Sequence, residues 1–478
     1  MVLAPSRGDG KEANFIQKFS RAFVRGDAFT KLSLLVWGLG YIGHGQLIKA
    51  LLVTLVQGLG LYFLGTSGIP ALKKLGTLGT VQMEMQFNPV TLKNEVNNYD
   101  NSFAILLLSV IALVVIVSLV VATMMVVQSN YLLQQQKAAG KKPNSFRQDI
   151  NCYLNEKFYV TLLTLPVLGV VVFTIVPLFI LIAVAFTNYD QQHMPPASLF
   201  TWVGLANFAS LFGGQSLSMT FSYAFGKVLG WTLVWAFFAT FTTFFGGVFL
   251  AMFINNKKTK CPRLWRTLFM ITIAVPQFVT LLLVRNFFSD AGIFNTMMNN
   301  AGVTDLLKTI GLLGQSMDHI PFLTDQHWAK FMIIMINIWV GVPYQMLIAT
   351  GVLMNIPSDI LEASTIDGAS PLQCFIYIKL PYLLSVQGPA LVTDFVKNVN
   401  NFNVIYLLTQ DVYITKDQAM ASSSAKEVDL LVTWLFRLTQ EQYNYKMAAV
   451  IGIMVFIICA VFTLVCFRFI NKKEATFS

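Results

Sequence analysis

Long apolar blocks alternate with short polar segments along most of this chain. Each block holds about 20 or more mostly apolar residues, enough for a helix to cross a hydrocarbon core of about 30 Å. The pattern therefore predicts an all-α polytopic membrane protein. We expect eight membrane-spanning helices, near residues 46–66, 103–127, 158–186, 226–254, 264–288, 329–353, 383–409 and 446–469. The stretch from Leu32 to Ile42 is also apolar but short and rich in glycine, so we expect an interfacial or re-entrant piece there.

The polar interruption between the sixth and seventh blocks is the most informative one. Residues 362–370 read Glu-Ala-Ser-Thr-Ile-Asp-Gly-Ala-Ser. Pro357 precedes them, and Ser358 or Asp359 is expected to cap the first turn of a short helix. Gly368 then permits a sharp change of direction.

A second amphipathic piece follows, from Leu372 to Leu380, and Pro381 is expected to open the next span. Residues 357–381 together predict a short helical elbow held at the membrane surface. An elbow of this kind can carry force between membrane helices and a soluble motor.

Composition agrees with a membrane protein. Hydrophobic residues make up 55% of the chain and charged residues 12%, whereas a soluble domain carries about 25% charged residues. The net charge of +10 invites a nucleic-acid partner, but the distribution of the charges excludes one. Lysine and arginine gather in alternate loops, before the first span, after the second and after the fourth.

The loops on the other side are poor in basic residues: 187–225 has none and 289–328 has only Lys308. The loop 67–102, with three lysines, is a weak exception. This is the positive-inside distribution, so we expect both termini in the cytoplasm of a bacterial cell.

Signals of covalent chemistry are missing from the sequence. It has no G-x-x-x-x-G-K-[ST] phosphate loop, so no ATP site of that type is expected in this chain. The four histidines are scattered, and no pair of carboxylates has a spacing typical of hydrolysis. We expect no enzyme, no metal site and no cofactor bound by this chain.

Two parts are expected along the chain. Residues 1–150 combine an N-terminal cytoplasmic segment with two additional spans, and residues 151–478 carry the other six. The stretch from Gln134 to Asn151 is polar, contains Gly140 and Pro143, and is interpreted as a linker between them.

The elbow, with its E-A-S-x-x-D-G-A-S and I-K-L-P sequences, resembles the EAA loop of ABC importer permeases. The flanking spans extend the likeness to maltose/maltodextrin permeases of the MalF type, roughly over residues 225–470. Asn337 to Tyr344 is similar to the span before that loop, and Asn400 to Thr409 to the span after it. Val428 to Trp434 also fits the pattern.

This resemblance implies a type I ABC importer permease, a transporter subunit without its own ATPase site. It implies a second homologous permease chain, two ATPase subunits that bind ATP-Mg, an extracellular sugar-binding protein and an oligosaccharide substrate in the cell membrane. The elbow would dock in a groove of an ATPase subunit and couple ATP-driven closure to the pathway. The residues expected to make that coupling contact are Glu362, Ala363, Asp367, Gly368, Ala369 and Phe375, with Ile366 on the same apolar face.

Polar residues inside spans are costly when unpaired and are therefore candidates for a binding site. Asn337, Gly341 and Tyr344 lie on one helical stripe, and Asn398 and Asn401 are three apart in the next span. The resemblance matches these positions to sugar-contacting residues. The alternative is hydrogen bonding between packed helices, with Gly341 as a close-packing point.

The chain also departs from the family pattern. Gln277, Gln345, Asp394 and Lys397 stand where smaller or apolar residues are expected, and we include them in the candidate substrate site. Asp394 and Lys397 either neutralise each other as an intrahelical pair or contact the substrate. The short loop 187–225 replaces a large extracellular domain, which suggests a simpler docking mode, with a lipid-anchored receptor.

Other cargoes and mechanisms stay open at this point. An ABC permease for another sugar or for glycerol phosphate would use Lys397 to face the phosphate. An ion-coupled secondary transporter would need intramembrane acids, of which only Asp394 is a good candidate, and it would leave the elbow unexplained.

Overall fold

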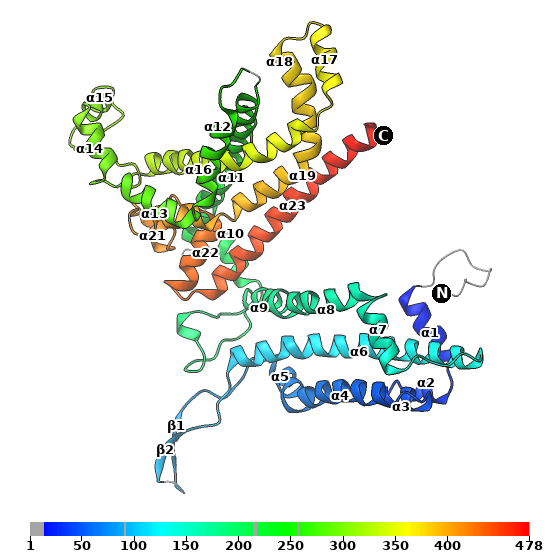
Figure 1. Cartoon of the computed structure of the whole chain (residues 1–478). Helices are drawn as coiled ribbons and strands as arrows, with labels where there is room; N and C mark the ends of the chain where they lie inside the picture. The colour runs from blue at the N-terminus through cyan, green and yellow to red at the C-terminus, as the bar shows by residue number, and fades with distance from the viewer. Residues whose placement is uncertain (1–13, 90–91, 214–217, 257, 478) are drawn as a thin grey trace. The chain divides into compact units, whose positions relative to one another are not determined.

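The computed structural model describes residues 14–89, 92–213, 218–256 and 258–477, and this part is almost entirely helical (Figure 1). Contacts between residues divide the chain into two compact units, Met1–Val203 and Gly204–Ser478. The proposed boundary at residue 150 concerns membership of the six-span core, and it stays a prediction. Residues 1–13 of the expected cytoplasmic segment lie outside the described residues.

The first unit contains the N-terminal spans and a small hairpin. Its strands pair antiparallel, with Met85 opposite Val96. Its elements are α1 (Phe15–Arg25), α2 (Ala28–Leu32), α3 (Trp37–Gly43), α4 (Leu47–Phe63), η1 (Leu64–Gly68), α5 (Ile69–Lys74), β1 (Met85–Asn88), β2 (Lys93–Val96), α6 (Ser102–Ala138), α7 (Phe146–Leu154), α8 (Phe158–Val170), η2 (Val171–Ile175), α9 (Val176–Val184) and η3 (Gln191–His193).

The apolar piece predicted at 32–42 forms no span. Its helix α3 has seven residues, about 10 Å of length at the usual helical rise, and packs against α4. The backbone before α3 is not helical, and the side chain of Gln57 in α4 supplies hydrogen bonds to it. This side chain accepts from the Trp37 backbone amide and donates to the Leu35 backbone carbonyl, both at 2.9 Å. A buried polar side chain thus replaces missing helical hydrogen bonds.

The second unit is all helical in its described part. Its elements are α10 (Ala206–Phe212), α11 (Ser218–Ile254), α12 (Pro262–Ala274), α13 (Gln277–Phe287), α14 (Ile293–Asn300), α15 (Val303–Thr309), α16 (Gln326–Met354), α17 (Ser358–Ile366), α18 (Pro371–Cys374), η4 (Phe375–Lys379), α19 (Leu380–Val399), α20 (Phe402–Thr409), α21 (Gln418–Ser422), α22 (Leu431–Gln440) and α23 (Tyr445–Phe477).

The described helices supply the predicted spans. Seven are long and apolar enough to cross a membrane, and the bent pair α12–α13 makes an eighth if it is counted as one span. The seven are Leu47–Lys74, Ser102–Ala138, Phe158–Val184, Thr220–Ile254, Gln326–Met354, Pro371–Thr409 and Tyr445–Ile470. The number and order of spans therefore agree with the sequence prediction.

Glycines set the closest contact of the second unit, where α11 packs along α16. A Cβ atom added to Gly247 would lie 2.5 Å from the Cβ of Gln345 and 2.8 Å from the backbone nitrogen of Met346. Gly246 likewise faces Val342, whose Cγ2 would be 2.7 Å from an added Cβ. Small residues let two helix backbones approach in a membrane protein, where packing drives association.

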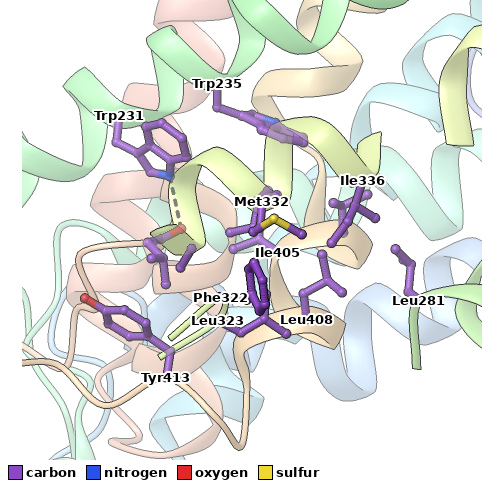
Figure 2. Close-up of a cluster of buried hydrophobic side chains, with 14 of the residues drawn as sticks. Trp231, Trp235, Leu281, Phe322, Leu323, Met332, Ile336, Ile405, Leu408 and Tyr413 are labelled. Carbon is purple, nitrogen blue, oxygen red and sulfur yellow. Dashed lines mark hydrogen bonds between the residues drawn. The ribbon is translucent and has the colours of Figure 1, made fainter. Parts of the chain in front are cut away.

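Two apolar clusters lie along α11 and α16. The cap cluster gathers Trp231, Trp235, Leu281, Phe322, Met332, Ile405 and Tyr413, among others, around one end of these helices (Figure 2). The loop cluster gathers Phe244, Val248, Ala251, Ile254, Met346, Ala349 and Leu383 nearer the other end. Residues 240–243 of α11 and 337–345 of α16 fall between the buried members of the two clusters in sequence.

The segment 410–445 folds onto the cap cluster. The Trp231 indole donates to the Val428 carbonyl at 3.1 Å, the bond drawn in Figure 2. Asp429 and Arg437, both buried, form an ion pair at 3.1 Å. Such interior hydrogen bonds and charges fix one arrangement of an otherwise irregular segment.

Candidate functional site

A cavity of about 560 Å³ opens in the second unit. All nine residues predicted as a substrate site line it: Gln277, Asn337, Gly341, Tyr344, Gln345, Asp394, Lys397, Asn398 and Asn401. They come from three predicted spans that are separated by up to 124 positions in sequence, from 277 to 401. The structure therefore brings together every member of the set.

The first break that lines the cavity separates α12 from α13. The two helices meet at 91°, and Val275 is extended, with φ of −78° and ψ of 129°. Pro276 follows, and proline disfavours the helical conformation of the residue before it. Irregular backbone is tolerated at membrane depth where it lines a cavity. We predicted one continuous span at 264–288, so the bend is a correction, and Pro276 was the signal for it.

The second break lies between α19 and α20, within the predicted span 383–409. Asn401 stands at the break and caps α20, because its side chain accepts from the Val404 amide at 3.3 Å. Asn398 and Asn401 therefore do not share one helical face. They still touch, since the Asn401 amide group donates to the Asn398 side chain at 3.4 Å.

Asn398 is tied to α11 as well. Its side chain donates to the Thr240 hydroxyl at 3.0 Å, and its carbonyl accepts from the Trp235 indole at 3.0 Å. The amides at this wall are thus held by neighbouring helices, which agrees with the packing alternative, and they line the cavity as the binding alternative requires.

Asp394 pairs with α16 and not with its own helix. It accepts a hydrogen bond from the Gln345 side chain at 2.8 Å. Among the described residues no ion pair joins Asp394 to Lys397, so the intrahelical pair considered above is absent. Lys397 is exposed at the cavity wall.

The predicted stripe on α16, Asn337, Gly341 and Tyr344, is exposed at one end and buried at the other. Tyr344 is 51% exposed, whereas Asn337 is buried. A Cβ added to Gly341 would lie 2.7 Å from Cγ2 of Thr243. Gly341 therefore serves the approach of α16 to α11, in addition to lining the cavity.

Several lining residues were not predicted. Thr243, Thr280, Asn400, Phe402 and Asn403 also face the cavity. The run Asn398 to Asn403 contains four asparagines, which is a readable signal in an apolar span. The two threonines carry no such signal, because threonine is common in membrane helices.

The chemistry of the wall is mostly neutral and polar. Side-chain amides offer both donors and acceptors, and Tyr344 and Phe402 offer aromatic faces. One carboxylate and one ammonium group complete the polar set. Such a wall can hold a neutral ligand that carries many hydroxyl groups.

The elbow, residues 357–381, has the predicted shape. Helix α17 ends at Ile366, and Gly368 follows with φ of +76°, a left-handed value that favours glycine. Ser370 then caps α18, since its hydroxyl accepts from the Gln373 amide at 3.3 Å. The change of direction at Gly368 is confirmed.

Two details of the loop differ from the prediction. Pro357 occupies the cap position of α17 without a side-chain hydrogen bond, so neither Ser358 nor Asp359 caps it. Helix α18 also continues through the π-helical segment η4 into α19, so Pro381 does not open a separate span. The wider π-helical turn accommodates the missing amide of Pro381.

The predicted coupling residues differ in accessibility. Glu362, Ala363, Asp367 and Gly368 are exposed, and Ala369 is partly exposed. Ile366 is 86% exposed. Phe375 instead packs on the loop cluster, with its ring centroid 5.8 Å from that of Phe249. It therefore fastens the loop to the spans and is not on the accessible face.

These features define a polytopic permease built from broken and unbroken spans around a polar cavity. Residues 243–473 match the family model described as binding-protein-dependent transport system inner membrane component. The chain belongs to this family of permeases, as a relative that is 32% identical over 90% of the chain also shows.

Curated relatives support the same assignment. The maltodextrin transport system permease protein MdxF of Bacillus subtilis is 32% identical over 90% of this chain and 93% of its own length. The galactooligosaccharides transport system permease protein GanP of the same organism is 32% identical over 85% of this chain and 93% of its own length. Separately from these relatives, the solved structure of a bacterial ABC transporter involved in the import of the acidic polysaccharide alginate contains a similar chain, with 22% identity, a TM-score of 0.49 and coverage of 68% of this chain and 99% of that one.

Proposed function

We propose that this chain forms half of the pathway of an ATP-driven importer for maltodextrin or a related neutral oligosaccharide. One observation carries the proposal: nine polar, charged or small residues from three spans line one cavity. MdxF is a maltodextrin permease by name. GanP is a permease for galactooligosaccharides, so the general cargo class is supported better than one particular sugar.

The cavity suits a sugar for physical reasons. Amide groups can donate to and accept from hydroxyls, and Tyr344 offers a ring for the apolar face of a pyranose. Asp394 can accept hydroxyl hydrogens while it keeps its bond to Gln345, because a carboxylate has several acceptor sites.

Energy would enter through the coupling loop. Ile366, Leu372 and Tyr377 are 86%, 66% and 76% exposed, which leaves an apolar surface for a groove in an ATPase subunit. In this scheme ATP-Mg binds only to a pair of partner ATPases, and a second homologous permease completes the pathway. An extracellular binding protein, lipid-anchored in the simplest case, delivers the sugar. Both termini then lie in the cytoplasm of a bacterial cell.

The site is tested by transport in proteoliposomes that contain the complete transporter. Tyr344→Ala is expected to raise the oligosaccharide concentration for half-maximal uptake by about tenfold, since stacking and packing are lost. Trp339→Ala is the matched control, because Trp339 is an exposed aromatic on the same helix outside the cavity. Equal effects of both variants, or none from Tyr344→Ala, would contradict the sugar site.

A second cargo is favoured by Lys397, which is exposed at the cavity wall without an ion pair among the described residues. Glycerol phosphate would place its phosphate there. Competition between a maltodextrin and glycerol phosphate for uptake separates the two cargoes. Uptake that persists when ion gradients collapse, but stops without ATP, excludes ion coupling.

A further inference from the structure

The N-terminal unit holds a second cavity, the Lys49 groove, of about 410 Å³. One wall of the groove is apolar and comes from two spans: Leu52 and Val53 of α4, and Leu132 and Leu133 of α6. Leu52 and Leu132 are 44% and 57% exposed. The groove is therefore open at its apolar side, along surfaces of membrane-spanning helices.

The other end of the groove is polar. Lys49 pairs with Asp149 of α7, and their side chains are 16% and 27% exposed. Lys157 lies with its ammonium 5.8 Å from the centre of the Tyr153 ring. No ion pair of Lys157 occurs among the described residues. Among the lining residues two lysines thus face one carboxylate. Glu156 lies beside them and accepts from the Cys152 thiol at 3.6 Å, so the excess of positive charge around the groove comes from the basic residues of the neighbouring segment 137–147.

The groove lies beside a basic segment of the chain. Lys137, Lys141, Lys142 and Arg147 stand in and beside the segment that joins α6 to α7. A basic pocket between spans, next to apolar helix surface, matches the two chemistries of a phospholipid: a phosphate and an acyl chain.

We propose that the Lys49 groove binds an anionic glycerophospholipid, with the phosphate at Lys49 and Lys157 and one acyl chain along the leucines. A small cytosolic anion would not need the apolar wall. A zwitterionic lipid would not match the net positive charge. The N-terminal spans would then have a role of their own, as a lipid-sensing or lipid-anchoring unit of the permease.

The proposal is tested with the full-length protein in nanodiscs that contain phosphatidylglycerol and phosphatidylcholine. After extraction in detergent, the lipids retained per protein are measured by mass spectrometry. The protein is expected to retain phosphatidylglycerol. Lys157→Gln is expected to lower this retention by about fivefold, the loss typical of one basic residue near an anionic surface.

Arg147→Gln is the matched control, because Arg147 is a basic residue of α7 that does not line the groove. Leu132→Trp is the second test, since it fills the apolar wall and keeps every charge. It is also expected to lower retention, while the thermal unfolding midpoint stays close to that of the unchanged protein.

Three results would overturn the proposal. Equal loss in Arg147→Gln and Lys157→Gln would mean that only the general surface charge matters. Equal retention of the two lipids would mean that no headgroup is recognised. Release of the lipid by millimolar inorganic phosphate, with Leu132→Trp unaffected, would assign the groove to a soluble anion.

Discussion

The contact between α11 and α16 depends on single residues without side chains. Gly246 and Gly247 on α11 and Gly341 on α16 each leave less than 3 Å for an added Cβ. These positions adjoin the 560 Å³ cavity of the second unit, since Gly341 and Gln345 both line it. The distance between the two helices therefore also determines the width of the cavity.

Gly247→Ala is expected to destabilise the protein by about 1–3 kcal/mol, because the new methyl group overlaps the backbone of α16. Thermal unfolding in detergent measures this change. Gly230→Ala is the matched control on the same helix, where an added Cβ meets no atom within 4 Å. That variant is expected to be neutral or slightly stabilising, and a similar loss in both would argue against close packing as the cause.

Single residues of the site were predictable because polar side chains stand out in apolar spans. Asn337, Asn398 and Asp394 were found this way. What the sequence could not decide was the partner of each polar group. Asp394 meets Gln345, which lies 49 positions earlier, and local spacing contains no information about such a pair.

The coupling loop depends on one backbone conformation between two helical elements. Gly368 adopts φ of +76° between α17 and α18. A proline cannot adopt this angle, whereas asparagine tolerates it better than other residues.

Gly368→Pro is therefore expected to abolish transport, because the two halves of the elbow are redirected, while the chain still inserts in the membrane. Gly368→Asn is expected to retain most of the activity. Uptake in proteoliposomes and the amount of protein in the membrane measure the two effects separately. Normal uptake by the proline variant would remove the loop from the coupling mechanism.

The segment 410–445 depends on Glu427, a buried carboxylate outside the spans. Burial raises its pKa, but hydrogen bonds from the Thr415 hydroxyl and from the amides of Lys416 and Asp417 outweigh this effect and hold the pKa below the ordinary value of 4.5. A lowered folded-state pKa means that the carboxylate stabilises the fold above the unfolded pKa, and that this contribution is lost as the pH falls through the folded value.

Glu427→Gln is expected to have a lower unfolding temperature than the unchanged protein near pH 7. The gap between the two unfolding temperatures is expected to shrink as the pH falls below about 4.5, because the carboxylate of the unchanged protein then becomes protonated. Thermal unfolding at several pH values checks this. Glu441→Gln serves as the control, because the Glu441 side chain is 52% exposed. A difference that stays constant with pH would assign the effect to packing.

At the scale of elements, the hydropathy pattern predicted the spans but not their breaks. A hydropathy pattern depends only on the length and composition of a segment. The mean hydropathy stays apolar across the breaks in both α12–α13 and α19–α20. The breaks depend on Pro276 and on the capping side chain of Asn401. Their positions follow from local chemistry that a window of some 20 residues averages out.

The chain combines two compact units, and its described residues form seven helices able to span a membrane, or eight spans if the bent pair α12–α13 counts as one. Their number, order and family were readable from the sequence, because apolar blocks and the elbow motif are continuous in it. The division after Val203 was not, since it depends on contacts between distant residues. The distribution of basic residues predicts the orientation of the chain.

This orientation is tested with a membrane-impermeant maleimide. Cys261, an exposed native cysteine, is expected to react in inverted vesicles only, when the other four cysteines are replaced by alanine. The matched site is Ser316→Cys in the loop after α15 with Cys261 also replaced, which is expected to react in right-side-out vesicles only. Reaction of both sites from the same side would contradict the predicted topology.

The uninterrupted path from α18 through η4 into α19 has a mechanical consequence. From Pro371 to Val399 the chain follows one continuous helical path that includes the π-helical segment η4 and Pro389, about 40 Å of helix at 1.5 Å per residue. One end carries the exposed elbow, and the other carries Asp394, Lys397 and Asn398. A continuous helix of this kind transmits a displacement from one end to the other, and η4 and Pro389 are the places where it can bend. A tilt applied at the elbow would thus move the part of the cavity wall that Asp394, Lys397 and Asn398 form, without any side chain changing its rotamer.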